Sequence, residues 1–141
     1  MGDDTTLAVA LSLAKAGLRI HPCRDKAPLL KDPTKDASAD PATVTRWFAV
    51  EFSGAQIGYY PGHWGVVVCD IDEKDGKSGS ASLRLAGLKL PPTFAYATPS
   101  GGRHHVYAAP EGEVPGTRNG FLEGVDVRAG LSNVIYYGGP L

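Results

Sequence analysis

Glycine and proline are the residues that most constrain what this chain can fold into. The 141 residues include 18 glycines and 11 prolines. Both residue types interrupt helices and strands and favour turns, so the sequence predicts short elements joined by many ordered loops. A chain of this length is long enough for one domain with a core of its own. We therefore expect one domain over residues 1–141.

The rest of the composition excludes several classes of protein. Hydrophobic residues make up 43% and charged residues 21% of the chain, as in an ordinary soluble globular domain. No apolar run approaches the ~20 residues of a membrane helix, and the first residues do not resemble a secretory signal. Cys23 and Cys69 are too few for a disulfide scaffold or a structural zinc site. We therefore expect a cytoplasmic protein without a membrane partner.

Periodicity and capping residues predict a mixture of helices and strands. The expected helices cover 5–16, a segment that begins at 41 after the cap Asp40, and 81–87. The expected strands cover 18–21, 56–59, 64–72, 94–98, 103–109, 125–128 and 133–137. Segments 24–40 and 111–120 are expected to be loops. This order predicts a single α+β domain built on a mainly antiparallel or mixed sheet flanked by helices, with the valine run in 64–72 as a central strand buried on both faces.

Two carboxylates, Asp70 and Asp72, come at the end of that central strand. Side chains alternate across a strand, so both are expected to face the same way. Neighbouring carboxylates repel each other and are costly to bury, and a divalent cation such as Mg²⁺ or Mn²⁺ between them removes that cost. The same spacing also fits a strand that runs out into solvent with two exposed acids.

A glycine turn followed by two histidines forms a second motif, TPSGGRHH over 98–105. Gly101 and Gly102 would let backbone amides approach a ligand closely. His104 and His105 point to opposite sides of the following strand, so at most one of them joins a given site. A histidine satisfied in the core or at the surface is the simpler explanation of either one.

A third pair, Asp126 and Arg128, shares one face of the strand expected over 125–128. Alone, this pair fits a simple surface ion pair. Together, the three motifs fit a two-metal phosphoryl-transfer site, in which three carboxylates hold two cations. The cations would activate an attacking 3′-hydroxyl and stabilise leaving pyrophosphate, and a histidine would hold a phosphate of the incoming nucleotide.

In this order and spacing, the motifs resemble the N-terminal domain of bifunctional DNA primase/polymerases, a branch of the archaeo-eukaryotic primase superfamily. The resemblance runs from about Leu7 to Pro140. It also includes GLRIHP (17–22), KAPL (26–29), ASADP (37–41) with Trp47 and Phe48 after it, and Ile57-Gly58 with the later Gly62. Each motif alone is common, but their order and spacing together are specific.

The resemblance implies a role for each matching residue. Asp70, Asp72 and Asp126 would hold Mg²⁺ or Mn²⁺ and would be catalytic. His104 matches the catalytic histidine that contacts the nucleotide phosphates, whereas His105 falls where an apolar residue is usual.

Other residues are expected to bind the nucleotide or the template. Ser100, Gly101 and Gly102 would shape the nucleotide pocket, and Arg128 would contact a phosphate or the template. Lys26 is a nucleotide or template contact, or a solvated loop lysine. Arg103 is expected to face away from the site.

The family fold is a primase-type α+β catalytic core whose RRM-like sheet carries the acids. Its activity implies ribo- or deoxynucleoside triphosphates and a single-stranded DNA template as partners. Family members usually continue past the segment matched by 136–140, often into a helical bundle or a helicase, so we expect part of the grip on the template to lie there. They are often found on phages and plasmids. The formal net charge of −1 also predicts weak binding of DNA, because affinity depends on phosphate contacts.

Two other functions stay open at this point. One is a nucleotide- or single-stranded-DNA-binding module of a replication complex with little or no turnover. The other is a metal-dependent phosphohydrolase. The products distinguish them: chain growth with pyrophosphate release, cleavage, or neither.

Overall fold

The computed structural model describes residues 3–111 and 116–141. Short elements dominate, as the glycine and proline content predicts. In chain order they are α1 (Asp3–Lys15), β1 (His21–Arg24), β2 (Ala27–Pro28), α2 (Pro33–Asp36), α3 (Pro41–Arg46), the π-helix η1 (Trp47–Glu51), β3 (Gln56–Tyr59), α4 (Pro61–Trp64), β4 (Val66–Ile71), α5 (Gly79–Leu85), β5 (Phe94–Ala97), β6 (Arg103–Ala108), β7 (Arg118–Leu122), β8 (Val125–Arg128) and β9 (Val134–Tyr136).

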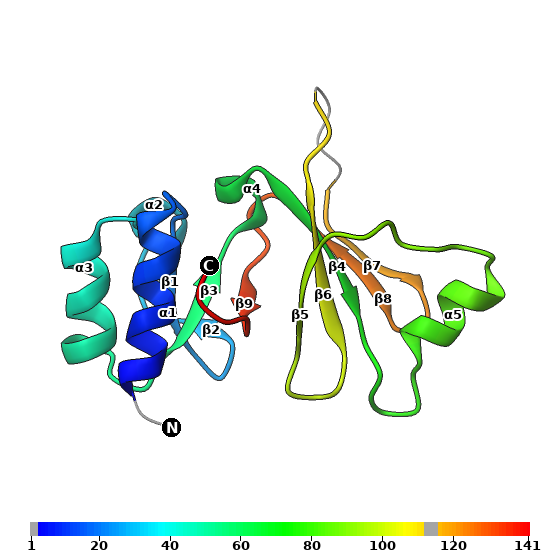
Figure 1. The fold of residues 1–141 in the computed structure, drawn as a ribbon, viewed down its shortest axis with the longest axis horizontal. Coiled ribbons are helices and arrows are strands. Elements are labelled where there is room, and N and C mark those ends of the chain that lie inside the picture. Colours follow the sequence, from blue (N-terminus) through cyan, green and yellow to red (C-terminus); the bar gives the residue numbers. More distant parts are fainter. Residues whose placement is uncertain (1–2, 112–115) are drawn as a thin grey trace.

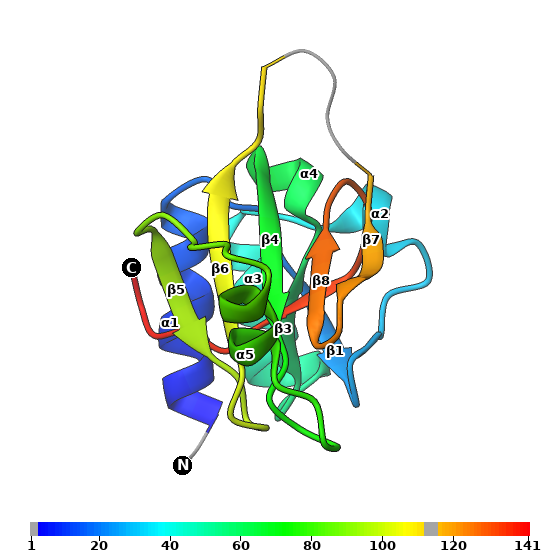
Figure 2. The same cartoon turned by 90° about the vertical axis from the view of Figure 1, so that its right-hand side faces the viewer.

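The strands form two antiparallel sheets, with the orders β2-β1-β3-β9 and β5-β6-β4-β8-β7. Helices α1 and α3 cover the outer side of the four-stranded sheet, and α5 lies beyond the five-stranded sheet (Figure 1). Figure 2 shows β4 at the centre of the five-stranded sheet, with α5 in front of it. The α+β class is therefore confirmed.

The expected single sheet is in fact divided in two. The division falls between β3 and β4, where Pro61 starts the short helix α4 and Gly65 ends it in the left-handed conformation, with φ of 68°. A helix of this kind redirects the chain, so β4 leaves the sheet to which β3 belongs. The expected turn at Pro61-Gly62 is thus a helical turn that separates the sheets.

The main core lies between the helices and the four-stranded sheet and extends to the second sheet. The predicted helix face made by Val44, Trp47 and Phe48 is buried. Asp40 caps α3 as expected, because its carboxylate accepts a hydrogen bond from the Thr43 amide. Tyr59, Tyr96, Val68 and Tyr136 continue the core toward the five-stranded sheet.

Several sequence-based expectations differ from the structure. The first strand covers His21–Arg24 rather than 18–21; Pro22 lies inside it because its carbonyl still accepts a hydrogen bond from the Leu29 amide. The 24–40 segment contains β2 and α2, and the described part of the 111–120 segment contains the start of β7; residues 112–115 lie outside the described part. Val66 and Val67, which point to opposite faces, are only half-buried, so the expected burial of both faces is wrong at the start of β4.

Among the described helices, none combines the length and the apolar character needed to cross a membrane.

Candidate active site

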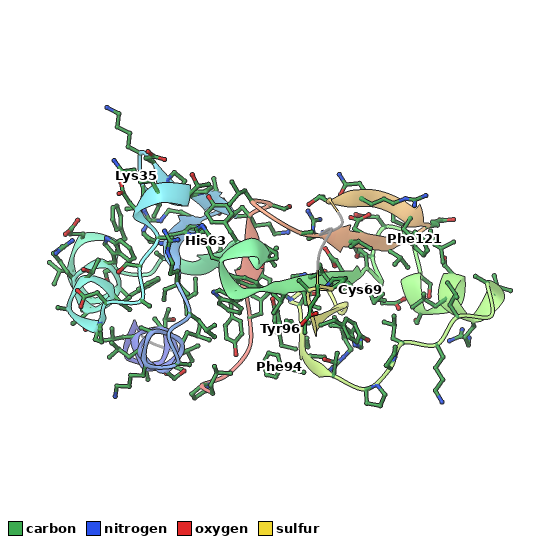
Figure 3. All side chains as sticks on the ribbon, turned by 90° about the horizontal axis from the view of Figure 1, so that it is seen from above. Lys35, His63, Cys69, Phe94, Tyr96 and Phe121 are labelled. Carbon is green, nitrogen blue, oxygen red and sulfur yellow. The ribbon has the colours of Figure 1, made fainter. Side chains whose placement is uncertain are left out.

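A row of polar side chains crosses the five-stranded sheet. Tyr96 on β5 lies directly opposite His104 on β6, His104 lies opposite Asp70 on β4, and Asp70 lies opposite Asp126 on β8. Residues directly opposite each other in an antiparallel sheet point to the same face. Figure 3 shows Tyr96 and Phe94 on the side of the sheet toward the four-stranded sheet. The strand register therefore places two carboxylates, a histidine and a tyrosine on the face between the sheets.

This row opens into a cavity of about 350 Å³ between the two sheets. Seven of the residues expected to act in a site line it: Lys26, Asp70, Asp72, Ser100, His104, Asp126 and Arg128. The remaining lining residues are Lys74, Thr98, Pro99, Asn133, Val134, Ile135 and Tyr137. The fold thus brings together chain segments more than 100 residues apart around one cavity.

Asp70 is at the centre of this arrangement. Its Oδ1 lies 3.4 Å from Nε2 of His104, and its Oδ2 accepts a hydrogen bond of 3.2 Å from Nε of Arg128. Burial raises the pKa of the Asp70 carboxyl, but the hydrogen bonds and charges of His104 and Arg128 outweigh it and hold the pKa below its ordinary value. Asp70 is therefore a carboxylate at neutral pH.

Arg128 also reaches the second carboxylate of the row. Its Nη2 lies 3.4 Å from Oδ2 of Asp126, while Oδ1 of Asp126 accepts a hydrogen bond of 2.6 Å from the Gly120 amide. The Asp126–Arg128 pair therefore does not lie free in solvent, as a simple surface ion pair would. One guanidinium joins the carboxylates of β4 and β8.

Asp72 lies just beyond the end of β4 and lines the same cavity as Asp70. Its amide donates to the Gly124 carbonyl, and its Oδ1 accepts a hydrogen bond of 3.2 Å from the Lys74 amide. Among the described residues, no three or more His, Cys, Asp or Glu side chains are arranged as a metal site. A metal site at Asp70, Asp72 and Asp126 stays a prediction.

His104 is almost fully buried, with 7% of its surface exposed, and is held from both sides. Its Nδ1 shares a hydrogen bond of 2.8 Å with the Tyr96 hydroxyl, which is also 2.8 Å from the Tyr59 hydroxyl and donates to the Ile135 carbonyl. Burial raises the pKa of both tyrosines, so both hydroxyls stay protonated. This network fixes the histidine ring with Nε2 toward Asp70.

The neighbours of His104 point elsewhere, as the alternation predicts. His105 lies opposite Cys69 in the register and is half-buried on the other face, and Arg103 is exposed. Figure 3 places Cys69 on the side of β4 away from Tyr96. Of the two histidines, only His104 lines the cavity.

The glycine turn between β5 and β6 brings Ser100 to the cavity. Gly101 has φ of 90°, which few other residues adopt. Gly102 is buried where a Cβ would collide with the Ile71 carbonyl oxygen. Neither glycine lines the cavity itself; their backbone closes the turn, in which the Thr98 amide donates to the Gly102 carbonyl.

Lys26 enters from the four-stranded sheet. It forms the β1–β2 turn with Asp25, and both residues have positive φ (68° and 52°), a conformation that side chains disfavour. Two side chains hold the turn: Gln56 accepts from the Lys26 amide at 2.8 Å, and Asn133 donates to the Lys26 carbonyl at 2.9 Å. Asn133 in turn accepts a hydrogen bond of 2.7 Å from Nε2 of the fully buried His21.

Tyr96, Tyr59 and Asn133 also belong to the site and its support, and none of them was predicted from the sequence. A buried tyrosine needs a hydrogen-bond partner for its hydroxyl. The two tyrosines in the expected strands 56–59 and 94–98 therefore could have indicated a buried polar network. Asn133, a polar residue just before the apolar run Val134–Tyr136, was another such indication. The sequence does not identify the hydrogen-bond partners of these residues, because the pairing of distant strands is set by the tertiary fold.

The sequence profile of the family described as bifunctional DNA primase/polymerase, N-terminal, matches residues 10–140. The chain belongs to this family. The match covers nearly the whole chain and includes every residue placed in the cavity, so the family points to an enzyme of the primase/polymerase nucleotidyltransferase class. A search of curated proteins gives no match.

Proposed function

We propose that this domain is a DNA primase/polymerase that makes or extends primers on a single-stranded DNA template from nucleoside triphosphates. The observation that carries the proposal is the row Asp126–Asp70–His104, which lines one cavity together with Asp72. Carboxylates, a histidine and cationic side chains around one hollow suit a polyphosphate substrate and its cations. The family membership supplies the reaction class.

The carboxylates fit a divalent metal. Asp70 and Asp126 lie directly opposite each other and share the cationic Arg128 as a counter-ion, so the pair accommodates positive charge between its oxygens. Oxygen ligands are those that Mg²⁺ and Mn²⁺ prefer. In the proposal, Asp70, Asp72 and Asp126 hold one or two such ions. When bound, the ions lower the pKa of the attacking hydroxyl and neutralise charge on the leaving pyrophosphate.

The other cavity residues bind and orient the nucleotide. Nε2 of His104, fixed by Tyr96, is placed to hold a phosphate oxygen beside Asp70. Lys26 approaches from the opposite wall and adds positive charge. The Ser100 turn offers a hydroxyl at the rim of the cavity. These groups would hold the triphosphate in line with the attacking hydroxyl, which is the main task of a protein in phosphoryl transfer.

Partners on the template side are part of the same proposal. A formal net charge of −1 gives little attraction for the phosphate backbone. We therefore expect this domain to bind single-stranded DNA weakly and in a salt-sensitive way. Further elements of the family architecture or a replicative helicase would supply additional contacts with the template.

A primer-synthesis assay tests the proposal. The purified chain is incubated with single-stranded template, labelled nucleotides and Mn²⁺, and the products are separated by length. The Asp70→Ala/Asp72→Ala variant is run beside the wild-type chain, and pyrophosphate is measured in the same reactions. We expect oligonucleotides and pyrophosphate from the wild-type chain only, with the wild-type chain and the double variant both folded by circular dichroism.

Other results would favour the alternatives. Cleaved nucleotide or strand without chain growth indicates a phosphohydrolase. Metal-dependent nucleotide binding without any product, with and without a pre-annealed primer, indicates a binding module. Equal product from the wild-type chain and the double variant would remove Asp70 and Asp72 from the mechanism.

A further inference from the structure

Arg128 is the cation that lies against the acidic pair. Its Nε is 3.2 Å from Oδ2 of Asp70, and its Nη2 is 3.4 Å from Oδ2 of Asp126. All three side chains are partly buried, with exposed fractions of 30%, 19% and 32% for Arg128, Asp70 and Asp126. Charges in such surroundings are only partly screened by solvent. The contact is therefore stronger than an ion pair on an open surface.

Without Arg128, the two carboxylates would repel each other. Asp70 and Asp126 are directly opposite across β4 and β8, where side chains of neighbouring strands come within about 5.5 Å at Cβ. Like charges at such positions destabilise a sheet. Asp70 also has Nε2 of His104 at 3.4 Å, but for Asp126 Arg128 is the cationic partner among the described residues. Arg128 thus has the electrostatic role that a metal ion would have.

We propose that Arg128 is an internal counter-ion that a divalent metal displaces, and that the freed guanidinium then binds the phosphates of the metal-bound nucleotide. This inference rests on the proposed function, because it takes Asp70 and Asp126 as metal ligands. Arg128 contacts Oδ2 of Asp70 and Oδ2 of Asp126. A metal ion bound between the two carboxylates would need the same oxygens, so the metal and Arg128 compete for them.

The position of Arg128 suits both states. Its side chain lines the cavity and is 30% exposed, so the guanidinium can leave the carboxylates without crossing the core. The other cavity cations, Lys26 and Lys74, lie in the turn after β1 and in the loop after β4. Once it leaves the carboxylates, the Arg128 guanidinium lies near these lysines. Its planar fork of N–H groups matches the geometry of phosphate oxygens, so it can bind a triphosphate in the cavity. Metal and nucleotide should therefore bind with positive cooperativity.

The test measures metal binding without any reaction. Free Mn²⁺ is titrated with the nucleotide-free chain and followed by electron paramagnetic resonance, for the wild-type chain and for Arg128→Gln, Arg128→Lys and Arg103→Gln. Arg103→Gln is the matched control, since it removes the same charge from an exposed arginine on β6 of the same sheet. Circular dichroism and thermal unfolding, with and without Mn²⁺, accompany each titration.

We expect Arg128→Gln to bind Mn²⁺ about tenfold more tightly than the wild-type chain, which corresponds to about 1.4 kcal/mol. The Mn²⁺ affinity of Arg128→Lys should lie between those of the wild-type chain and Arg128→Gln, because a single ammonium replaces only one of the two contacts. Arg103→Gln should match the wild type. Without metal, Arg128→Gln should also melt at a lower temperature than Arg103→Gln. Addition of Mn²⁺ should raise the melting temperature of Arg128→Gln by more than that of Arg103→Gln. Nucleotide should increase Mn²⁺ affinity more in the wild-type chain than in Arg128→Gln.

The possible failures can be told apart. Saturable Mn²⁺ binding that is equal or weaker in folded Arg128→Gln overturns the counter-ion role and leaves the proposed function intact. If Arg128→Gln does not fold, the Arg128→Lys titration decides in the same way. If neither the wild-type chain nor any folded variant binds Mn²⁺, the metal site itself is wrong, and the proposed mechanism fails together with this inference.

Discussion

The two walls of the cavity are built on different principles. On the five-stranded sheet, Asp70, His104 and Asp126 stand side by side on neighbouring strands, so backbone register alone aligns them. On the four-stranded sheet, Lys26 stands in a turn of unfavourable backbone conformation, and side-chain hydrogen bonds from Gln56 and Asn133 hold it. The first wall is fixed by the sheet, and the second depends on a few polar contacts.

The two walls are therefore expected to differ in rigidity. Groups that act on reacting atoms must hold their geometry, and a sheet provides that. A lysine on a two-residue turn has more freedom to follow the substrate. We therefore expect damage to the first wall to abolish the reaction and leave the fold intact, whereas damage to the second should alter stability or nucleotide affinity and leave chemistry in place.

The largest effect is expected from Asp70→Asn. The amide keeps the shape of the side chain but removes the charge that faces His104, Arg128 and the proposed metal. Primer extension should fall by about a thousandfold or more, because an interaction made mainly in the transition state is lost. Asp75→Asn is the matched control; this aspartate is exposed, and its φ of 56° is one that asparagine tolerates. Similar rates for the two variants would contradict a catalytic role for Asp70.

The first wall was largely accessible from the sequence. The alternation of side chains in strands identifies the faces of Asp70, His104 and Asp126, and β8 has the predicted bounds. Strand pairing was not accessible, because nothing local states that Asp70 lies between His104 and Asp126. The division into two sheets was missed for the same reason.

The second wall was mostly hidden from the sequence. Lys26 was a candidate only through the family resemblance, and its partners Asn133 and Gln56 lie 107 and 30 residues away. His21 was placed at the end of a strand that actually begins there. Gly58 gives the clearest reason for this failure: it is opposite His21, and a Cβ at Gly58 would collide with the His21 ring. Such a fit exists only in the assembled fold.

The next largest effect concerns pH and the second wall. Burial lowers the pKa of His21 to about 4, even though its hydrogen bond with Asn133 acts in the other direction. In the unfolded chain the same group titrates near 6.5. Below about pH 6.5 the unfolded chain therefore gains a proton that the folded chain excludes, and stability is lost as pH falls toward 4.

Between pH 7 and pH 5 this loss should amount to roughly 2 kcal/mol. It is measured by urea unfolding at both values. His21→Gln, which can still donate to Asn133, should lose much less stability over this range. His63 and His105, whose pKa values burial also lowers, would account for the part that remains. Asp70, with a lowered pKa, contributes only at more acidic pH. An unchanged pH dependence in His21→Gln would show that His21 is not the main titrating group.

A smaller effect is expected from Tyr96→Phe, which tests how firmly the first wall is held. The change removes the hydroxyl that bonds Nδ1 of His104 and leaves the ring packing in place. The KM for the nucleotide should rise about tenfold, since His104 loses the contact that orients it. Tyr59→Phe is the control: it removes a buried hydroxyl from the same network but leaves the Tyr96–His104 bond. Equal KM values for both variants would indicate general loosening of the core.

The smallest effect is expected from Lys26→Met, which removes the charge of the second wall but keeps an apolar stem. The backbone hydrogen bonds to Gln56 and Asn133 do not involve the Lys26 side chain, so the turn and the free energy of unfolding should stay unchanged. Because a solvated ammonium near a phosphate contributes only about 1 kcal/mol, nucleotide affinity should fall severalfold, with a weaker dependence on salt. Asn133→Ala should give the opposite pattern. It leaves Nε2 of His21 buried without its partner, at a cost of about 1–3 kcal/mol, and it weakens nucleotide binding only through the released turn. If Lys26→Met changed neither affinity nor its salt dependence, Lys26 would be a solvated loop lysine, and the second wall would serve only to close the cavity.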